Sequence, residues 1–183
     1  VYDDTTAATV SGTPTLSGNR FGQTIALSGA VNSGSFAQSN VGNAISITPN
    51  LSDLSLDNPN FYIAGPSTAI TANITQALLT IGGSAVYNGS ASVSGLTATG
   101  VNGQTFVISG GTGTMASANV GTNALSAVNL SSATLSAGGS NPGMASNYTL
   151  VGPSLGSVTI SPAAITVSAS DTVKTYDATT SVS

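Results

Sequence analysis

The stretch that decides the fold is Ala77-Leu78-Leu79-Thr80-Ile81-Gly82-Gly83-Ser84-Ala85-Val86-Tyr87-Asn88-Gly89-Ser90. It reads as a short strand, a small-residue connection and a tyrosine turn. A variant returns as Ala163-Ala164-Ile165-Thr166-Val167-Ser168-Ala169-Ser170-Asp171-Thr172-Val173-Lys174-Thr175-Tyr176-Asp177-Ala178-Thr179-Thr180, and the turn alone opens the chain as Val1-Tyr2-Asp3-Asp4-Thr5-Thr6. The three tyrosines are 85 and 89 residues apart. The chain is therefore predicted to be a piece of a tandem array.

Other landmarks recur in the same order. Gly34-Ser35-Phe36-Ala37 is echoed by Gly113-Thr114-Met115-Ala116, and Asn60-Phe61-Tyr62-Ile63-Ala64-Gly65-Pro66-Ser67 is echoed by Asn147-Tyr148-Thr149-Leu150-Val151-Gly152-Pro153-Ser154. A period in the eighties is longer than the roughly 20 to 50 residues of solenoid repeats. It suits small domains joined end to end.

The composition limits the chemistry that the chain can perform. Only 4% of its 183 residues are charged, against about 25% in ordinary soluble domains, and Glu, His and Cys are absent. A hydroxyl nucleophile would have only Lys174 as its base, and that lysine occurs in one of the three copies. We therefore expect no enzyme activity and no cofactor. The apolar fraction of 40%, spaced by polar residues, favours a folded β protein over a disordered one.

Charge and hydropathy also limit the partners. The net charge is −4, and Arg20 and Lys174 are the only basic residues, so the chain lacks the electrostatic footprint of a nucleic-acid-binding protein. No apolar run approaches the roughly 20 residues that span a bilayer, so membrane insertion is not expected. The absence of Cys is compatible with export. The opening Val1-Tyr2-Asp3 is no signal peptide, and we expect the segment to come from inside a longer chain.

Alternation of apolar and polar residues places the strands. It is clearest over residues 23–31, 43–48, 105–109 and 124–130, and residues 61–64 are also expected to form a strand. No stretch has a sustained helical period. The predicted fold is all-β: two tandem small antiparallel β-sandwich or β-grasp-like modules in line, plus the first strand of a third. The predicted boundaries are 1–75 for a first module that lacks its first strand, 76–161 for the second, and 162–183 for the opening strand of the third.

The phase of the repeat leaves an unmatched strand at each end. The first module lacks a counterpart of Leu78-Leu79-Thr80-Ile81, and the tail Ile165-Thr166-Val167 is that strand without a module to join. Because an unpaired edge accepts a strand from another chain, one hypothesis is that the tail of one copy completes the head of the next. The alternative is a frayed end with no such role.

The sequence resembles the tandem Tyr-Asp-Gly-type and glycine-rich β repeat modules of two-partner-secretion adhesins, which are similar to filamentous haemagglutinin. The matching pieces are the Ala-Ile-Thr-Val strand at residues 164–167, the Lys-Thr-Tyr-Asp-Ala-Thr-Thr run at 174–180, Asn119-Val120-Gly121-Thr122, and Asn147-Tyr148-Thr149-Leu150. The motif glycine is replaced by Asp4 and Ala178, where a turn with positive φ would be strained. The resemblance implies a secreted protein on the bacterial surface, whose modules form a stalk that contributes to adhesion or to a biofilm matrix.

Two kinds of candidate site stand out. Asp53, Asp57 and Asn58 are a weak candidate for Ca²⁺, because their spacing matches no calcium loop and Asn before Pro is ordinary turn chemistry. The repeat motif supplies Tyr2 and Asp3, Tyr87 and Asn88, and Tyr176 and Asp177. We expect each tyrosine to pack at a joint between modules with its hydroxyl bonded, and the alternative is a stacking platform for a sugar.

Three functions follow from these patterns. The first is a structural stalk repeat whose partners are the neighbouring modules of the same chain. The second is a module that binds carbohydrate or matrix polysaccharide, which predicts a cleft with exposed aromatic side chains and converging amides. The third is a self-assembling extracellular filament whose copies join by strand addition through the C-terminal tail.

Overall fold

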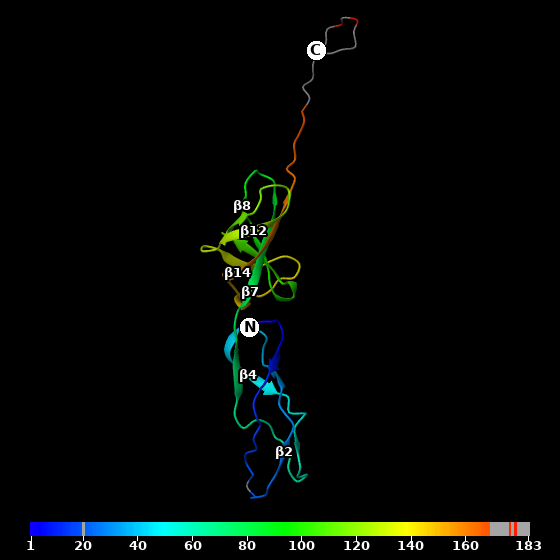
Figure 1. Cartoon of the computed structure of the whole chain (residues 1–183), viewed down its shortest axis with the longest axis vertical. Coiled ribbons are helices and arrows are strands. Elements are labelled where there is room, and N and C mark those ends of the chain that lie inside the picture. The colour runs from blue at the N-terminus through cyan, green and yellow to red at the C-terminus, as the bar shows by residue number, and fades with distance from the viewer. Residues whose placement is uncertain (20, 169–175, 177, 179–183) are drawn as a thin grey trace.

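The computed structural model describes residues 1–19, 21–168, 176 and 178. Its two sheet modules follow one another along the long axis of an extended molecule, and residues 162–168 leave the second module at the far end (Figure 1). Within the described residues the regular structure is strand apart from two short 3₁₀ turns, so the prediction of an all-β fold is confirmed.

The first module contains a four-stranded antiparallel sheet and a separate two-stranded one. The first sheet has the order β1 (Ala7–Thr9), β3 (Ser33–Phe36), β4 (Gly42–Pro49) and β6 (Ile70–Ile74). The second pairs β2 (Leu27–Ser28) with β5 (Ser55–Leu56). In β4 the side chains of Ile45 and Ile47 are more buried than those of their neighbours, as period-two alternation requires.

The second module is one curled eight-stranded sheet. Its strands are β7 (Ala77–Val86), β8 (Ser92–Ser94), β9 (Thr97–Thr99), β10 (Thr105–Ser109), β11 (Thr112–Met115), β12 (Gly121–Asn129), β13 (Thr134–Ala137) and β14 (Tyr148–Ser161), with 3₁₀ turns η1 (Val101–Gly103) and η2 (Ala145–Asn147). The order across the sheet is β13-β10-β9-β7-β14-β12-β11-β8. The pair β7 and β14 is parallel, so this sheet is mixed, whereas the modules were predicted to be antiparallel.

The same plan is visible in both modules. The order β1-β3-β4-β6 in the first corresponds to β8-β11-β12-β14 in the second, and the pair β2-β5 corresponds to β10-β13. Equivalent backbone hydrogen bonds close equivalent turns: the Phe36 N–H donates to the Thr6 carbonyl at 2.7 Å, and the Met115 N–H donates to the Ala91 carbonyl at 2.8 Å. Likewise the Tyr2 N–H bonds the Thr75 carbonyl at 2.8 Å, and the Tyr87 N–H bonds the Ser161 carbonyl at 2.9 Å.

The hydrophobic core lies mainly in the second module. There the side chains of Leu79 and Ile81 from β7 are 1% and 0% exposed, and Phe106, Ile108 and Val158 are similarly buried. In the first module the buried apolar side chains are Tyr2, Ala8, Ile45 and Ile74. The two modules share a topology, but fewer apolar side chains are buried in the first module than in the second.

Three predicted strands are shorter or missing in the structure. The strand expected over residues 23–31 is reduced to β2, residues 61–64 form no strand, and the tail Ile165-Thr166-Val167 forms none. Within the residues that the structure describes, β2 pairs only with the two-residue strand β5, and residues 61–64 and 165–167 pair with no strand. An alternating pattern without a partner along its length does not form a longer ladder. Lys174 and Asp177 lie outside the described residues.

Candidate functional site at the joint between the modules

The joint is the place where the first module meets the second. Two residues, Thr75 and Gln76, connect β6 to β7, and the N-terminal turn lies against the same place (Figure 1). A connection this short leaves the two modules little freedom to separate. The contacts across the joint therefore decide how stiffly they are held.

Aromatic rings form the centre of the joint. The rings of Tyr2 and Tyr148 meet edge to face with centroids 5.4 Å apart, and Phe106 packs against Tyr148 in the same manner at 4.9 Å. All three side chains are at most 4% exposed. Edge-to-face contact is a preferred geometry for aromatic pairs and stabilises them by about 0.5 to 1.5 kcal/mol beyond their buried area.

Gln104 links the two tyrosine hydroxyls. The Tyr148 hydroxyl donates to Gln104 Oε1 at 2.8 Å, and Gln104 Nε2 donates to the Tyr2 hydroxyl at 3.1 Å. The Tyr2 hydroxyl in turn donates to Asp4 Oδ1 at 2.8 Å, and the Tyr148 hydroxyl accepts from the Val101 N–H at 2.9 Å. Burial raises the pKa of Tyr148 above its ordinary value. The chain of bonds ties the N-terminal turn of the first module to η1 of the second.

A second set of bonds crosses the joint beside the rings. Asn147, which is 1% exposed, donates from Nδ2 to Asn40 Oδ1 at 2.9 Å and accepts from the Val41 N–H at 3.0 Å. Gln76 Nε2 donates to the Ser146 carbonyl at 3.1 Å. Within the described residues no buried side-chain polar atom lacks a partner. Fully satisfied buried networks hold one arrangement because any other leaves a polar group unpaired.

Glycine makes room for the aromatic contact. A Cβ at Gly100, just before η1, would stand 2.5 Å from the Tyr148 ring, closer than any side chain tolerates. Two hydrogen bonds at its hydroxyl, and ring contacts with Tyr2 and Phe106, hold Tyr148 in this position. The absence of a side chain at Gly100 is thus part of the joint.

The three motif tyrosines have different surroundings. Tyr2 lies in the joint, whereas Tyr87 is 43% exposed and Tyr176 is 91% exposed. Packing at a joint, predicted for all three, is therefore seen only for Tyr2, because the other two have no module against them in the described part of the chain.

The motif turns themselves are alike. Asp3 Oδ1 accepts from the Thr5 N–H at 2.9 Å, and Asn88 Oδ1 accepts from the Ser90 N–H at 2.9 Å. The following position is left-handed in each copy, with φ of 66° at Asp4, 76° at Gly89 and 63° at Ala178. The hydrogen bonds from the Thr5 backbone and hydroxyl lower the pKa of Asp3 below its ordinary value.

The weak calcium candidates are used in separate local bonds. Asp57 Oδ1 accepts from the Ala26 N–H at 2.8 Å, Asn58 Nδ2 donates to Gln23, and Asp53 accepts from the Ser52 hydroxyl at 3.3 Å. In the part of the chain that the structure describes, no three His, Cys, Asp or Glu side chains gather as a metal site would need.

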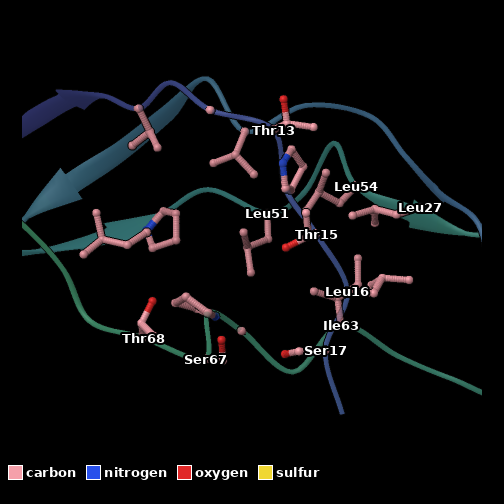
Figure 2. A pocket seen from close by; sticks show the side chains of 18 of the residues that line it. Thr13, Thr15, Leu16, Ser17, Leu27, Leu51, Leu54, Ile63, Ser67 and Thr68 are labelled. Carbon is pink, nitrogen blue, oxygen red and sulfur yellow. The ribbon is translucent and has the colours of Figure 1, made fainter. Parts of the chain in front are cut away.

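A groove of about 450 Å³ opens in the first module (Figure 2). Residues 10–17 line one side and residues 62–68 the other, with Leu27, Leu51 and Leu54 among the apolar side chains. Tyr62, which is 84% exposed, is its one aromatic side chain among the described residues, and no Asn or Gln contributes to the lining. Carbohydrate binding, which predicts several aromatics and converging amides, stays a prediction that a glycan array would test.

No protein-family model, curated protein or solved structure compared with the chain matches it. Over its described residues, the protein has no helix with the length and apolar character needed to cross a bilayer.

Sequence reasoning missed the two amides on which the joint depends. Gln104 and Asn147 look like ordinary polar residues in a chain rich in such residues, although Asn147 belongs to a repeated landmark. The pairing of each amide with atoms about a hundred positions away, as in the contact of Gln104 with Tyr2, leaves no local signal.

Proposed function

We propose that this chain is a structural repeat segment of a secreted, surface-attached bacterial adhesin, in which the modules set distance and carry tension between the cell and an adhesive region. The proposal includes a place outside the cell, a role in cell-cell or biofilm-matrix adhesion, export of the two-partner-secretion type, and no catalytic activity. The observation that carries it is the arrangement of β7 and β14 relative to the joint.

The parallel pair β7 and β14 lies along the path that tension would take. β7 begins at Ala77, directly after the joint, and β14 ends at Ser161, where the chain leaves the module (Figure 1). Their register runs from Tyr148 opposite Ala77 to Ser161 opposite Val86. Force applied at Ala77 and Ser161 therefore shears the two strands, and the hydrogen bonds between them resist together and do not open one after another.

The joint passes the same force to the first module. Its aromatic contacts and amide bonds join elements of both modules, and the short connection at residues 75–76 keeps them in line. Buried, satisfied networks of this kind restrict rotation between modules. A stalk needs such stiffness because a flexible joint would let the adhesive region fold back.

The composition suits an exposed extracellular stalk. With Arg20 and Lys174 as the only basic residues, the chain offers few cleavage positions to proteases that cut after Lys or Arg. The low charge also leaves neighbouring stalks little electrostatic repulsion at close range. Both properties support the proposal independently of the geometry.

Single-molecule pulling tests the shear geometry directly. The chain has no cysteine, so handles can be attached at introduced ones. In the variant L78C/S161C, force acts on opposite ends of the parallel pair. In the matched variant V86C/S161C, force acts on the same end of both strands. Residues 78, 86 and 161 are all exposed, so the handles can be attached there. We expect the first variant to need a force several times larger than the second. Equal rupture forces in the two geometries would remove the mechanical basis of the proposal.

A further inference from the structure

We propose that Asn88 is a site of self-modification, at which the side-chain amide is lost as ammonia and a carboxylate takes its place. The site lies in the tyrosine turn of the second module, a part of the repeat motif that the joint does not use. The reaction consumes only water, so each chain acquires the new charge with time and without an enzyme. This modification goes beyond the proposed stalk function and does not depend on it.

The turn contains one of the two Asn-Gly pairs of the chain, which are Asn88-Gly89 and Asn102-Gly103. In such a pair the backbone nitrogen of the glycine can attack Cγ of the asparagine and close a five-membered ring. Glycine favours this attack because it has no Cβ to shield its nitrogen. The pair at Asn88 is exposed and outside any strand, and a Cβ at Gly89 would meet no atom within 4 Å. The nitrogen at this position is therefore accessible.

The reaction has two steps. In the first, the Gly89 nitrogen forms a bond to Asn88 Cγ, the bond from Cγ to Nδ2 breaks, and Nδ2 leaves as ammonia with the proton of the Gly89 N–H. In the second, water adds to one of the two ring carbonyls, the bond from that carbon to the Gly89 nitrogen breaks, and a proton of the water returns to the nitrogen. The product is aspartate when water adds at Cγ and isoaspartate when it adds at the main-chain carbon.

The structure places a hydrogen-bond donor where the first step needs one. The Ser90 N–H donates to Asn88 Oδ1 at 2.9 Å. Negative charge develops on this oxygen when Cγ is attacked, and a donor already in place stabilises that charge. Among the described residues no hydrogen bond holds the Asn88 carbonyl or the Gly89 N–H, so the peptide between the two residues can rotate toward Cγ.

Asn102 is also followed by glycine, but contacts at the joint hold it in place. Its Nδ2 donates to Asp4 Oδ2 at 3.4 Å, and its backbone carbonyl accepts from Asn141 Nδ2 at 3.1 Å. It also lies within η1, which the Gln104 N–H closes by donating to the Val101 carbonyl at 3.0 Å. Ring closure would rotate the Asn102 peptide and break these bonds. The joint therefore protects one Asn-Gly pair, while the other is unprotected.

The turn at Asn88 has the arrangement of a turn that holds aspartate. The Asp3 carboxylate accepts from both the N–H and the hydroxyl of Thr5, each at 2.9 Å. Ser90 occupies the position of Thr5 and has the same two donors. In both turns the hydroxyl also accepts from the N–H two positions along the chain, at 3.3 Å for Thr5 and 3.0 Å for Ser90. The aspartate product would thus gain charge-assisted hydrogen bonds without rearrangement of the turn.

Peptide mapping by mass spectrometry tests the inference. Chymotryptic cleavage after Tyr87, Leu96 and Phe106 separates the two Asn-Gly pairs into different peptides. In the folded chain stored in neutral buffer, Asn88 should convert at least about 10-fold faster than Asn102, which corresponds to a difference of about 1.4 kcal/mol in the barrier. In concentrated urea, where the joint is unfolded, the two should convert at similar rates. Equal rates in the folded chain, or no conversion at Asn88, would overturn the proposal.

A variant of the glycine tests the ring mechanism. Gly89→Ala places a methyl group beside the attacking nitrogen and should slow the conversion of Asn88 by about 10-fold or more. The turn accepts alanine, because Ala178 has the same place in its copy of the motif with a φ of 63°. The matched control is Gly95→Ala, at an open position with a φ of 67° that follows serine, and it should leave the rate unchanged. An undiminished rate in Gly89→Ala would rule out the ring.

Two substitutions test whether aspartate fits the turn. Asn88→Asp should keep the midpoint of thermal unfolding at or above that of the parent chain, because Ser90 supplies two donors to the carboxylate. Asn102→Asp should lower the midpoint, since a second carboxylate would then face Asp4 across the joint. A midpoint below that of the parent for Asn88→Asp would contradict the proposed fit. Because β7 ends at Val86, before the site, the rupture force across β7 and β14 should be the same in Asn88→Asp, so this inference and the stalk proposal can fail separately.

Discussion

The two modules of this chain have corresponding strands in the same order but differ in one element. In the second module β7 joins the pair β10-β13, through β9, to the rest of the sheet. In the first module that position is open, and β2-β5 stays a separate pair. The corresponding side chains differ accordingly: Ile108 of β10 is 2% exposed, while Leu27 of β2 is only half-buried.

This difference shows that the central strand does more than add its own residues to the core. β7 contributes Leu79 and Ile81, and its presence also extends β14 over the residues whose first-module counterparts, 61–68, form no strand. Sheet structure is cooperative in this sense, because each strand satisfies the backbone of two neighbours and shields the side chains between them. Removal of a central strand therefore weakens the elements on both sides.

The largest expected effect is a contrast in core energy at equivalent positions. Ile108→Ala should destabilise the second module by about 2 to 5 kcal/mol, because it leaves a cavity in a filled core. Leu27→Ala should cost about 1 kcal/mol, since its side chain is already partly in water. Urea unfolding with hydrogen exchange at individual amides would assign each loss to its module. Similar losses at the two positions would contradict the view that the first module lacks a filled core.

A smaller effect is expected at equivalent glutamines. Gln104→Ala should destabilise the protein by about 1 to 3 kcal/mol, since the buried hydroxyls of Tyr2 and Tyr148 lose a partner. Gln23, its exposed counterpart in the first module, is the matched control, and Gln23→Ala should change stability by less than about 0.5 kcal/mol. Thermal unfolding measures both, and small-angle scattering of the Gln104→Ala chain should show a more flexible joint. An unchanged scattering profile would mean that Gln104 does not stiffen the joint.

The smallest expected effect separates the two motif turns by pH. Hydrogen bonds from Thr5 lower the pKa of Asp3 in the folded protein, so its contribution to stability is present above the ordinary value of 3.8 and is lost as pH falls through the lower folded value. The equivalent turn uses Asn88, which does not titrate. NMR titration below pH 4 should therefore shift the amide of Thr5 and leave that of Ser90 unchanged. Parallel shifts at both turns would contradict this origin.

The sequence by itself determined the β class and the recurrence of the motif, because both depend on local features. Alternation with period two identifies Gly42–Pro49 and Thr105–Ser109 as strands, and the tyrosine turn is recognisable by its residues in every copy. The residue that follows Asp3, Asn88 and Asp177 has a positive φ in each copy. This is also a local property, because it depends on the turn motif and not on distant contacts.

Only the tertiary structure decided which alternating segments become strands and which tyrosine is buried. Residues 61–64 and 165–167 have strand patterns but no partner, and Tyr2 differs from Tyr87 and Tyr176 because a second module lies against it. The parallel pairing of β7 with β14 and the amide bonds of Gln104 and Asn147 join residues about 70 to 105 positions apart in the chain. The alternation of apolar and polar residues shows that a segment is able to form a strand. Whether the strand forms depends on a neighbouring strand that satisfies its backbone N–H and C=O groups.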